Sequence, residues 1–187
     1  MLTRKSFYFI RHGETDYNRH YLCAGSRIDA PLNQTGTSQA ISLKEKISSL
    51  AINKVICSPL RRTVQTAMLA METQKALLPS FVIEDGIKEC DIGDFDGQPV
   101  PKLIQYMEET EDHVPFPNGE SRHNLKGRVK EAINKSLKVH GEDILFVSHG
   151  LVYQELLKIT GNPVHHIQNG TLVQFKPQGD SWIILNL

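Results

Sequence analysis

Apolar positions along the chain form two kinds of pattern, which predict strands in some segments and helices in others. Short continuous apolar runs are typical of strands buried on both faces, whereas a spacing of three and four residues is typical of an amphipathic helix. The apolar runs predict strands at residues 6–10, 54–57, 81–83 and 143–148, and a final hairpin formed by 171–176 and 181–186. The helical spacing predicts helices at 35–50, 59–74, 99–109, 121–139 and 150–160.

The segments between these elements carry signals of helix starts and loops. Ser58 is the expected N-cap of the second helix, because a serine side chain accepts a hydrogen bond from a free backbone N–H, and Pro59 suits the first helical position. Residues 84–98 are rich in Gly and Asp, and 108–120 are acidic and contain proline, so both are predicted to be loops. Because strands alternate with helices and no linker divides the chain, residues 1–187 are predicted to form one α/β domain with a largely parallel sheet.

Composition narrows the class of protein. The 187 residues include 21 Lys and Arg against 21 Asp and Glu, and this zero net charge argues against a nucleic-acid or membrane-surface binder. No apolar run of the sequence approaches the roughly 20 residues needed to cross a bilayer. The cysteines Cys23, Cys57 and Cys90 lack metal-binding spacing and cannot all pair, which favours a reducing, cytoplasmic location. Each is expected to be a small half-buried residue, and Cys90, beside Glu89, is the one candidate for a reactive thiol.

Polar clusters directly follow three of the predicted strands. Arg11-His12-Gly13-Glu14 follows the first strand, Ser58 to Arg62 follows the second, and Ser148-His149-Gly150 follows the fourth. In open α/β sheets, sites form beyond the carboxyl ends of the strands. We therefore expect these clusters, which lie far apart in sequence, to meet at one rim of the sheet.

The residue types in and near these clusters suit phosphoryl transfer. A histidine beside an arginine stays neutral, and neutral imidazole is a nucleophile, so His12 is a candidate nucleophile. Arg62 and His149 are candidates to bind phosphate oxygens, and Glu89 to protonate the leaving oxygen. Taken singly, each of these residues also fits an ordinary surface or core role. On chemistry alone, the neighbouring acids are alternatives to Glu89: Glu84, Asp85, Asp91, Asp94 and Asp96.

Four groups of residues occur in a familiar order. They are Arg11-His12-Gly13-Glu14-Thr15 with Asn18, Ser58-Pro59-Leu60-Arg61-Arg62-Thr63 with Thr66-Ala67, Glu89 with Gly93 and Phe95-Asp96-Gly97, and Ser148-His149-Gly150. Three shorter landmarks accompany them: Pro31-Leu32 with Gly36, 117–121, and Asn169-Gly170-Thr171. Together these motifs resemble those of the histidine phosphatase superfamily, also called phosphoglycerate-mutase-like, over Phe7 to about Phe175.

The resemblance implies a fold, a chemistry and a set of site residues. The implied fold is α/β, a mixed, mainly parallel sheet with helices on both faces. The implied chemistry needs no metal or cofactor. The implied residues are His12 as the phosphohistidine; Arg11, Arg62 and His149 as the phosphate pocket, with Arg62 preferred to Arg61; Glu89 as acid and base; Asn18 and Gly150 as substrate-binding residues; and Glu14 as a supporting residue.

Two segments depart from the family pattern. Residues 25–29 are one residue longer than the usual spacing before Pro31-Leu32, so Arg27 is a candidate substrate contact, with a surface role as the alternative. His165-His166 has no family counterpart, and a metal role is disfavoured because no third ligand is evident.

The sequence favours a phosphatase acting on a small-molecule phosphate ester. Family mutases carry a long basic insertion before the second histidine, whereas the segment from Cys90 to Ser148 is short and acidic in its middle. Its basic residues on the helix predicted at 121–139 are expected to form a solvated face: Arg122, Lys126, Arg128 and Lys130. The alternatives are a cofactor-dependent phosphoglycerate mutase, a phosphoprotein phosphatase and a non-catalytic phospho-ligand binder. The oligomeric state is left open, and the apolar stretch around Trp182 is expected to be buried within the monomer.

Overall fold

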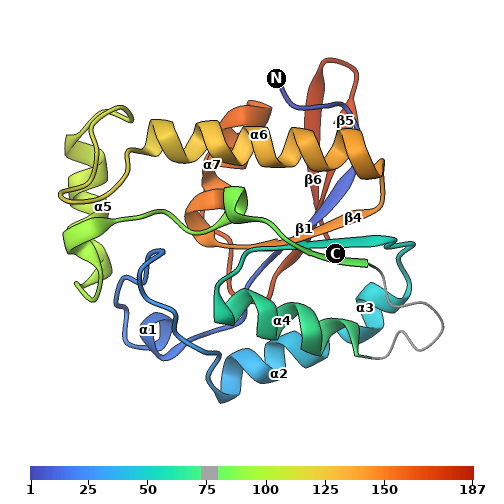
Figure 1. Cartoon of the computed structure of the whole chain (residues 1–187), viewed down its shortest axis with the longest axis horizontal. Coiled ribbons are helices and arrows are strands. Elements are labelled where there is room, and N and C mark those ends of the chain that lie inside the picture. Colours follow the sequence, from blue (N-terminus) through green and yellow to red (C-terminus); the bar gives the residue numbers. More distant parts are fainter. Residues whose placement is uncertain (73–79) are drawn as a thin grey trace.

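The computed structural model describes residues 1–72 and 80–187, whose strands form one six-stranded sheet (Figure 1). The strand order is β3-β2-β4-β1-β5-β6. The pairs β1/β4, β2/β4 and β2/β3 are parallel, whereas β1/β5 and β5/β6 are antiparallel. The predicted mixed, mainly parallel sheet is confirmed. The strand bounds are β1 Phe7–Arg11, β2 Lys54–Cys57, β3 Ser80–Ile83, β4 Ile144–Ser148, β5 Leu172–Gln178 and β6 Ser181–Asn186.

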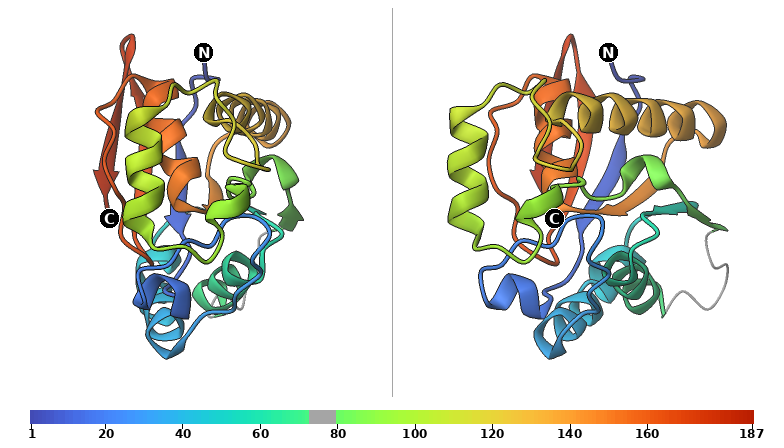
Figure 2. Two further views of the ribbon diagram at one scale, coloured as in Figure 1. Left: turned by 90° about the vertical axis from the view of Figure 1, so that its left-hand side faces the viewer. Right: turned by 60° about the vertical axis from the view of Figure 1, so that its left-hand side comes forward.

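Helices cover both faces of the sheet, as the sequence predicts (Figures 1 and 2). The helices α6 and α7 lie on one face, and α2, α3 and α4 lie on the other. The short helix α1 and the helix α5 stand apart from both layers, at the left of Figure 1. The bounds are α1 Asp16–Arg19, α2 Gln34–Ser42, α3 Lys44–Ser48, α4 Arg61–Met71, α5 Val100–Glu109, α6 Arg122–His140 and α7 Gly150–Thr160, with 3₁₀ turns η1 Asp85–Ile87 and η2 Gly93–Phe95.

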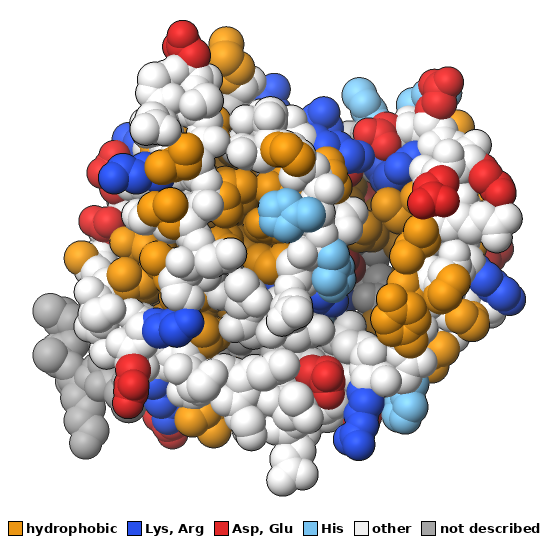
Figure 3. Space-filling model, turned by 180° about the vertical axis from the view of Figure 1, so that it is seen from behind, with side chains coloured by type: hydrophobic (Ala, Val, Ile, Leu, Met, Phe, Trp, Pro, Cys, Tyr) orange, Lys and Arg blue, Asp and Glu red, His pale blue; other side chains and the backbone are white. Residues whose placement is uncertain are grey.

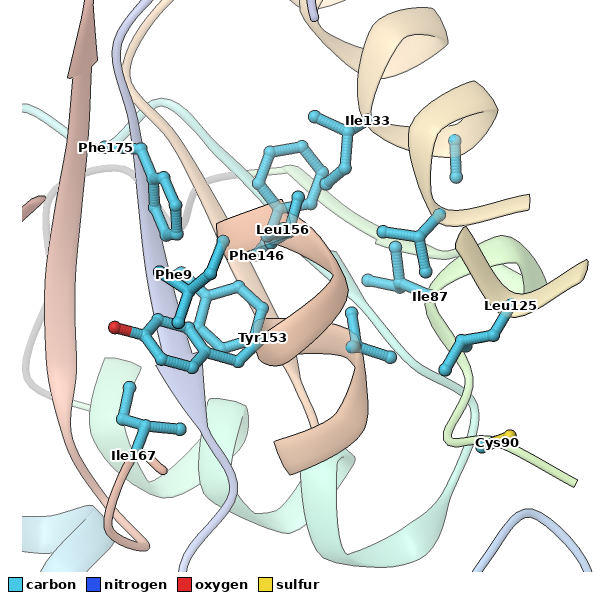
Figure 4. Close-up of a cluster of buried hydrophobic side chains, with 14 of the residues drawn as sticks. Phe9, Ile87, Cys90, Leu125, Ile133, Phe146, Tyr153, Leu156, Ile167 and Phe175 are labelled. Carbon is cyan, nitrogen blue, oxygen red and sulfur yellow. The ribbon is translucent and has the colours of Figure 1, made fainter. Parts of the chain in front are cut away.

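Alternate residues of the central strands build two separate cores. Phe7 and Phe9 of β1 pack with α6 and α7, whereas Tyr8 and Ile10 pack with α3 and α4. This alternation follows from the strand period of two, which sends successive side chains to opposite faces. Figure 4 shows the first core, in which Phe146 of β4 and Tyr153 of α7 lie among the aromatic rings. Trp182 belongs to the same core, so its predicted burial within the monomer is confirmed.

Two helix predictions need correction. The helix expected at 35–50 is interrupted at Leu43, whose N–H bonds to Ala40 O three residues back, although its dihedral angles stay helical. The helix expected to begin at Ser58-Pro59 begins instead at Arg61, with Leu60 as N-cap. Ser58 continues the backbone hydrogen bonding beyond the end of β2, because its N–H donates to Val147 O. Its hydroxyl bonds to His149 Nε2. The expected end of that helix near Gln74 lies outside the described residues.

Within residues 1–72 and 80–187, no helix combines the length and the apolar character needed to cross a membrane.

Candidate active site

The three polar clusters meet where β1, β2 and β4 end. Arg11 is opposite Ser148 in the β1/β4 register, and Cys57 is opposite Val147 in the β2/β4 register. The residues just beyond these positions therefore lie side by side, and His12 N donates to Ser148 O over 3.0 Å. The expectation of one shared rim is confirmed.

His12 is buried, and its hydrogen bonding leaves one ring nitrogen free to react. Its Nδ1 lies 2.7 Å from Gly13 O. Because a carbonyl oxygen only accepts, Nδ1 carries the hydrogen and Nε2 keeps its lone pair. Burial, followed by the charges of Arg62 and Arg11, holds the pKa of His12 well below its usual value, so the ring is neutral.

Gly13 fixes the backbone next to His12 through a close approach of two chain segments. A Cβ at Gly13 would lie 2.5 Å from Gly36 O, a distance that backbone atoms cannot relieve by a rotamer change. The Gly13 N–H donates to Thr66 Oγ1 over 3.0 Å, which ties the His12 loop to α4. These two contacts at Gly13 fix the position of His12, in addition to its place at the end of β1.

Arg11 is held by the segment before β5. Its Nη1 donates to Ile167 O over 2.6 Å and lies 2.8 Å from His166 Nε2. Since a guanidinium only donates, His166 accepts this bond in its neutral form. Burial lowers the pKa of Arg11 to about 10, partly opposed by the Glu89 carboxylate, so the side chain remains a cation.

Arg62 is a fully buried cation in the first turn of α4. Its Nη1 donates to Ile28 O over 2.7 Å, and its Nη2 lies 3.2 Å from the carbonyl oxygens of Ala24 and Gly25. Burial lowers its pKa, and Glu89 is the first of the acids that oppose this shift. Arg61 is exposed, so the structure agrees with the preference for Arg62.

His149 is oriented by Ser58, a contact that the sequence did not indicate. His149 Nε2 lies 2.7 Å from Ser58 Oγ, and both side chains are fully buried. Among the described residues, the buried Ser58 O–H has no acceptor other than His149 Nε2, so it donates to this nitrogen and the ring hydrogen sits on Nδ1. Burial and the charge of Arg62 hold the pKa of His149 well below its usual value.

Glu89 lies at the N-terminus of α7. Its Oε1 accepts the N–H of Cys90 over 2.9 Å, and its Oε2 accepts that of Leu151 over 3.3 Å. Burial raises the pKa of this carboxyl, and the backbone bond from Cys90 and the charge of Arg62 oppose the shift. A carboxyl with a raised pKa can carry a proton closer to neutral pH, as a general acid requires.

Three buried N–H donors of the site have no hydrogen-bond partner within the described residues. They are Arg11 Nε, Arg62 Nε and His149 Nδ1. Buried donors left unpaired are costly and rare, so their concentration around His12 needs an explanation. The rings of His12 and His149 are 5.3 Å apart between centroids, and the first two donors belong to cations. This set can bind a compact anion such as phosphate by charge-assisted hydrogen bonds.

Two of the remaining predicted residues, Asn18 and Gly150, border a cavity with a volume of about 190 Å³. Asn18 lines it, and its Oδ1 accepts the Thr15 N–H, which leaves its amide NH₂ for a ligand. Gly150 also lines the cavity, packed beside the Arg11 guanidinium. Glu14 lies outside the lining and accepts a bond from Asn33 over 2.8 Å, a supporting role.

Two further residues act in the site without having been predicted for it. Ser58 was expected to cap a helix, and it orients His149 instead. Asn169 was noted as a landmark, and its Nδ2 donates to His12 O over 3.0 Å. Neither contact has a local sequence signal, since each joins segments that are more than 90 residues apart.

The structure also shows the contacts of the residues that depart from the family pattern and of Cys90. Arg27 pairs with Asp91 over 2.8 Å and does not line the cavity, so the candidate substrate contact is replaced by the surface alternative. Cys90 is fully buried, and burial raises the pKa of its thiol, so a reactive thiol at this position is wrong. His166 binds Arg11, and His165 lies 3.0 Å from the Tyr153 hydroxyl. Among the described residues, no group of three or more His, Cys, Asp or Glu is arranged to hold a metal ion.

Comparison with known proteins defines the family. The family model of the histidine phosphatase superfamily (branch 1) matches residues 7–187. The "uncharacterized phosphatase PhoE" of Bacillus subtilis (strain 168) is 32% identical over 165 residues, covering 88% of this chain and 81% of that protein. The "probable phosphoglycerate mutase GpmB" of Enterobacter sp. (strain 638) is 30% identical over 191 residues, covering 94% of this chain and 86% of that protein.

Two other matches show how the length and the fold of this chain compare with those of known proteins. An agropine synthesis reductase of Rhizobium rhizogenes is 31% identical over 189 residues, covering 95% of this chain and 41% of that protein. The chain thus spans about two fifths of the length of that relative. The solved structure of a mycobacterial glucosyl-3-phosphoglycerate phosphatase shares the fold, with a TM-score of 0.81 at 19% identity, over 97% of this chain and 98% of that one.

The chain belongs to the histidine phosphatase superfamily, branch 1. This is the family that its motifs predict.

Proposed function

We propose that this chain hydrolyses a small phosphate monoester through a phosphohistidine at His12, without a metal ion. One observation carries the proposal, namely the three unpartnered buried donors beside a neutral histidine whose Nε2 is free. The two guanidinium groups supply the positive charge that stabilises the transferred phosphoryl group.

In the first step, His12 Nε2 attacks phosphorus and the ester P–O bond breaks. The Nε–H groups of Arg11 and Arg62 and the Nδ1–H of His149 donate to the equatorial oxygens, where charge is concentrated in the transition state. Protonated Glu89 gives its proton to the leaving oxygen, so the alcohol departs neutral.

In the second step, a water molecule replaces the alcohol. Glu89, now a carboxylate, takes a proton from the water as its oxygen bonds to phosphorus, and the N–P bond to His12 breaks. Inorganic phosphate and neutral His12 remain, which restores the starting state. The raised pKa of Glu89 suits both halves of this cycle, because the carboxyl holds a proton more readily than a free glutamate and still gives it to the leaving oxygen.

The experiment compares the wild-type protein with His12→Ala and with a matched control, His123→Ala, which removes an exposed histidine on α6. Phosphate release from p-nitrophenyl phosphate is measured with EDTA present, and radiolabelled phosphoenzyme is trapped by quenching in alkali. We expect wild type and His123→Ala to release phosphate and carry the label, and His12→Ala to do neither. Loss of activity in EDTA, or a label that survives in His12→Ala, contradicts the proposal.

A phosphoglycerate mutase is the second candidate, favoured by the 30% identity to a protein named as one. A mutase assay primed with 2,3-bisphosphoglycerate separates the two. Transfer of phosphate to 2- or 3-phosphoglycerate faster than its release to water supports the mutase.

A further inference from the structure

The part of the cavity away from the phosphate-binding groups is bordered by hydrophobic side chains. Figure 3 shows that hydrophobic side chains gather on the α5 side of the molecule. The cavity volume of about 190 Å³ is small compared with the roughly 300–1,000 Å³ of typical ligand pockets, so the ligand is compact. The hydrophobic side chains of this apolar wall are Leu22, Ile92, Val100, Leu103, Ile104, Met107 and Leu151.

The helix α5 supplies four residues of the apolar wall from one stripe. Val100, Leu103, Ile104 and Met107 follow the spacing of three and four residues that places side chains on one face of a helix. A different face anchors the helix, because the Tyr106 ring packs 5.1 Å from that of Phe95 and its hydroxyl donates to Pro115 O over 2.8 Å. The stripe both packs against the core through Leu103 and lines the cavity, where Ile104 keeps 46% of its surface exposed.

The charged side chains that line the cavity all belong to the phosphate-binding end. Among the described residues of the lining, they are Arg11, Arg62 and Glu89. His166 also lines the cavity, but it accepts a bond from Arg11 and is neutral. Arg27, in the loop beside the cavity, is committed to Asp91.

A second anionic group on the substrate has no cation to meet in this lining. A carboxylate or second phosphate that enters would lose its water against the apolar wall without a compensating charge, which is strongly unfavourable. A hydrocarbon group in the same place gains free energy by leaving water.

We propose that the substrate is a phosphate monoester whose organic group is compact and apolar, of the aryl or arylalkyl class, with no second anionic group. This inference rests on the proposed function, because the phosphate-binding end must hold the ester while the apolar wall selects its organic group. It also separates the chain from a phosphoglycerate mutase, whose substrates carry a carboxylate.

The test uses three primary alkyl esters, so that the leaving oxygen is comparable and the organic group differs. They are 2-phenylethyl phosphate, glycerol 3-phosphate and 3-phosphoglycerate, each assayed by kcat/KM for phosphate release. Because one methylene in a hydrophobic pocket changes kcat/KM by about tenfold or more, we expect 2-phenylethyl phosphate to exceed 3-phosphoglycerate by at least a hundredfold. Equal values, or a preference for 3-phosphoglycerate, overturn the inference.

A pair of variants tests the apolar wall itself. Ile104→Arg places a cation at a half-exposed position of the wall, where folding tolerates it. We expect kcat/KM to fall at least tenfold for 2-phenylethyl phosphate and to rise for 3-phosphoglycerate. The matched control is Gln105→Arg, exposed on the same helix and outside the lining, which should change neither value more than twofold. An unchanged ratio of the two substrates in Ile104→Arg contradicts the inference.

Assay of p-nitrophenyl phosphate separates this inference from the proposed function. If p-nitrophenyl phosphate is hydrolysed and labels His12 while 3-phosphoglycerate is the preferred alkyl ester, the substrate inference alone fails. If no ester releases phosphate and no label appears, both proposals fail.

Discussion

At the scale of single residues, the site depends on keeping two histidines neutral beside two arginines. Burial and the neighbouring positive charge both disfavour the protonated form of His12 and His149. The same burial leaves Arg11 and Arg62 charged, because a guanidinium with a lowered pKa is still protonated at neutral pH. One environment therefore suits both roles in the proposed mechanism, a neutral histidine as nucleophile and a charged arginine as anion-binding group.

Glu89→Gln tests the acid and base role of this carboxyl. The amide keeps the size of the side chain but gives no proton to the leaving oxygen, so turnover of an alkyl phosphate should fall by about 10²–10⁴-fold. Turnover of p-nitrophenyl phosphate should fall far less in the phosphoryl-transfer step, since its leaving group needs little protonation. The measurement is single-turnover release of each alcohol, which isolates that step.

Equal slowing of the two esters would assign the general acid to another residue. Glu84→Gln serves as the control, because Glu84 caps η1 and lies outside the cavity lining. It should leave the ratio of the two rates unchanged.

At the scale of elements, α6 holds the loop that carries Glu89. Arg128 donates to the carbonyl oxygens of Gly86, Lys88 and Glu89 over 3.1, 2.7 and 3.0 Å. The same guanidinium pairs with Glu120 over 2.6 Å. The prediction that Arg128 belongs to a solvated helix face is therefore wrong. Its guanidinium donates to three backbone carbonyl oxygens, which would otherwise lack these hydrogen bonds.

Arg128→Met should displace the Glu89 backbone and uncover those carbonyl oxygens. We expect kcat for an alkyl phosphate to fall about tenfold or more, and the free energy of unfolding to fall by about 1–3 kcal/mol. Steady-state kinetics and urea unfolding measure the two effects. Lys138→Met, an exposed position on the same helix, is the matched control. If both variants behave like wild type, Arg128 does not position Glu89.

The sequence predicted the elements with strong periodicity and missed those that depend on distant contacts. The strand at 54–57 matches β2 at both ends, and the order of strands and helices is confirmed. The start of α4 was wrong because Ser58 has a closer partner in His149, which follows the neighbouring strand β4, than in its own helix. The four-residue α1 is too short for a periodic signal, so its capping box at Thr15 was not recognised.

The meeting of the candidate site residues was predictable because their motifs lie at strand ends, whereas the supporting contacts were not. His12 and His149 follow β1 and β4 directly, and the register of these strands brings the two rings together. Arg128 bonds to three backbone carbonyl oxygens, and every residue type has such an oxygen, so the sequence does not indicate the contact. Such contacts follow only from the packing of α6 against η1.

At the scale of the whole molecule, the sheet separates two cores and leaves the chemistry at one edge. The phenylalanines of β1 and β4 pack under α6 and α7, and the opposite face packs under α2, α3 and α4. Both cores fix the strand ends, so the positions of His12 and His149 depend on the stability of the complete fold.

The free energy of unfolding should fall as pH falls below about 6.5, the ordinary pKa of histidine. His12 and His149 have lowered pKa values in the folded state, so below the ordinary value of 6.5 the unfolded chain binds protons that the folded chain does not. Each histidine should reduce the free energy of unfolding by about 1.4 kcal/mol per pH unit in that window. The raised pKa of Glu89 acts with the opposite sign and offsets part of the loss at lower pH.

Urea unfolding between pH 7.5 and pH 5.5 measures this dependence. His149→Asn should reduce the slope by about one proton, because the amide does not titrate. A free energy of unfolding that stays constant over this range would mean that the folded chain binds as many protons as the unfolded chain, which contradicts the lowered pKa values of both histidines.

The three unpaired donors also set a limit on how stable this fold can become while it keeps the proposed activity. Each buried N–H without a partner costs about 1–3 kcal/mol, and an apolar side chain of similar shape at the same place would not incur that cost. Selection for heat resistance alone would thus favour losing these polar groups, beginning with His149, whose ring is fully enclosed. Variants that unfold at a higher temperature than this chain should therefore include some that no longer turn over substrate.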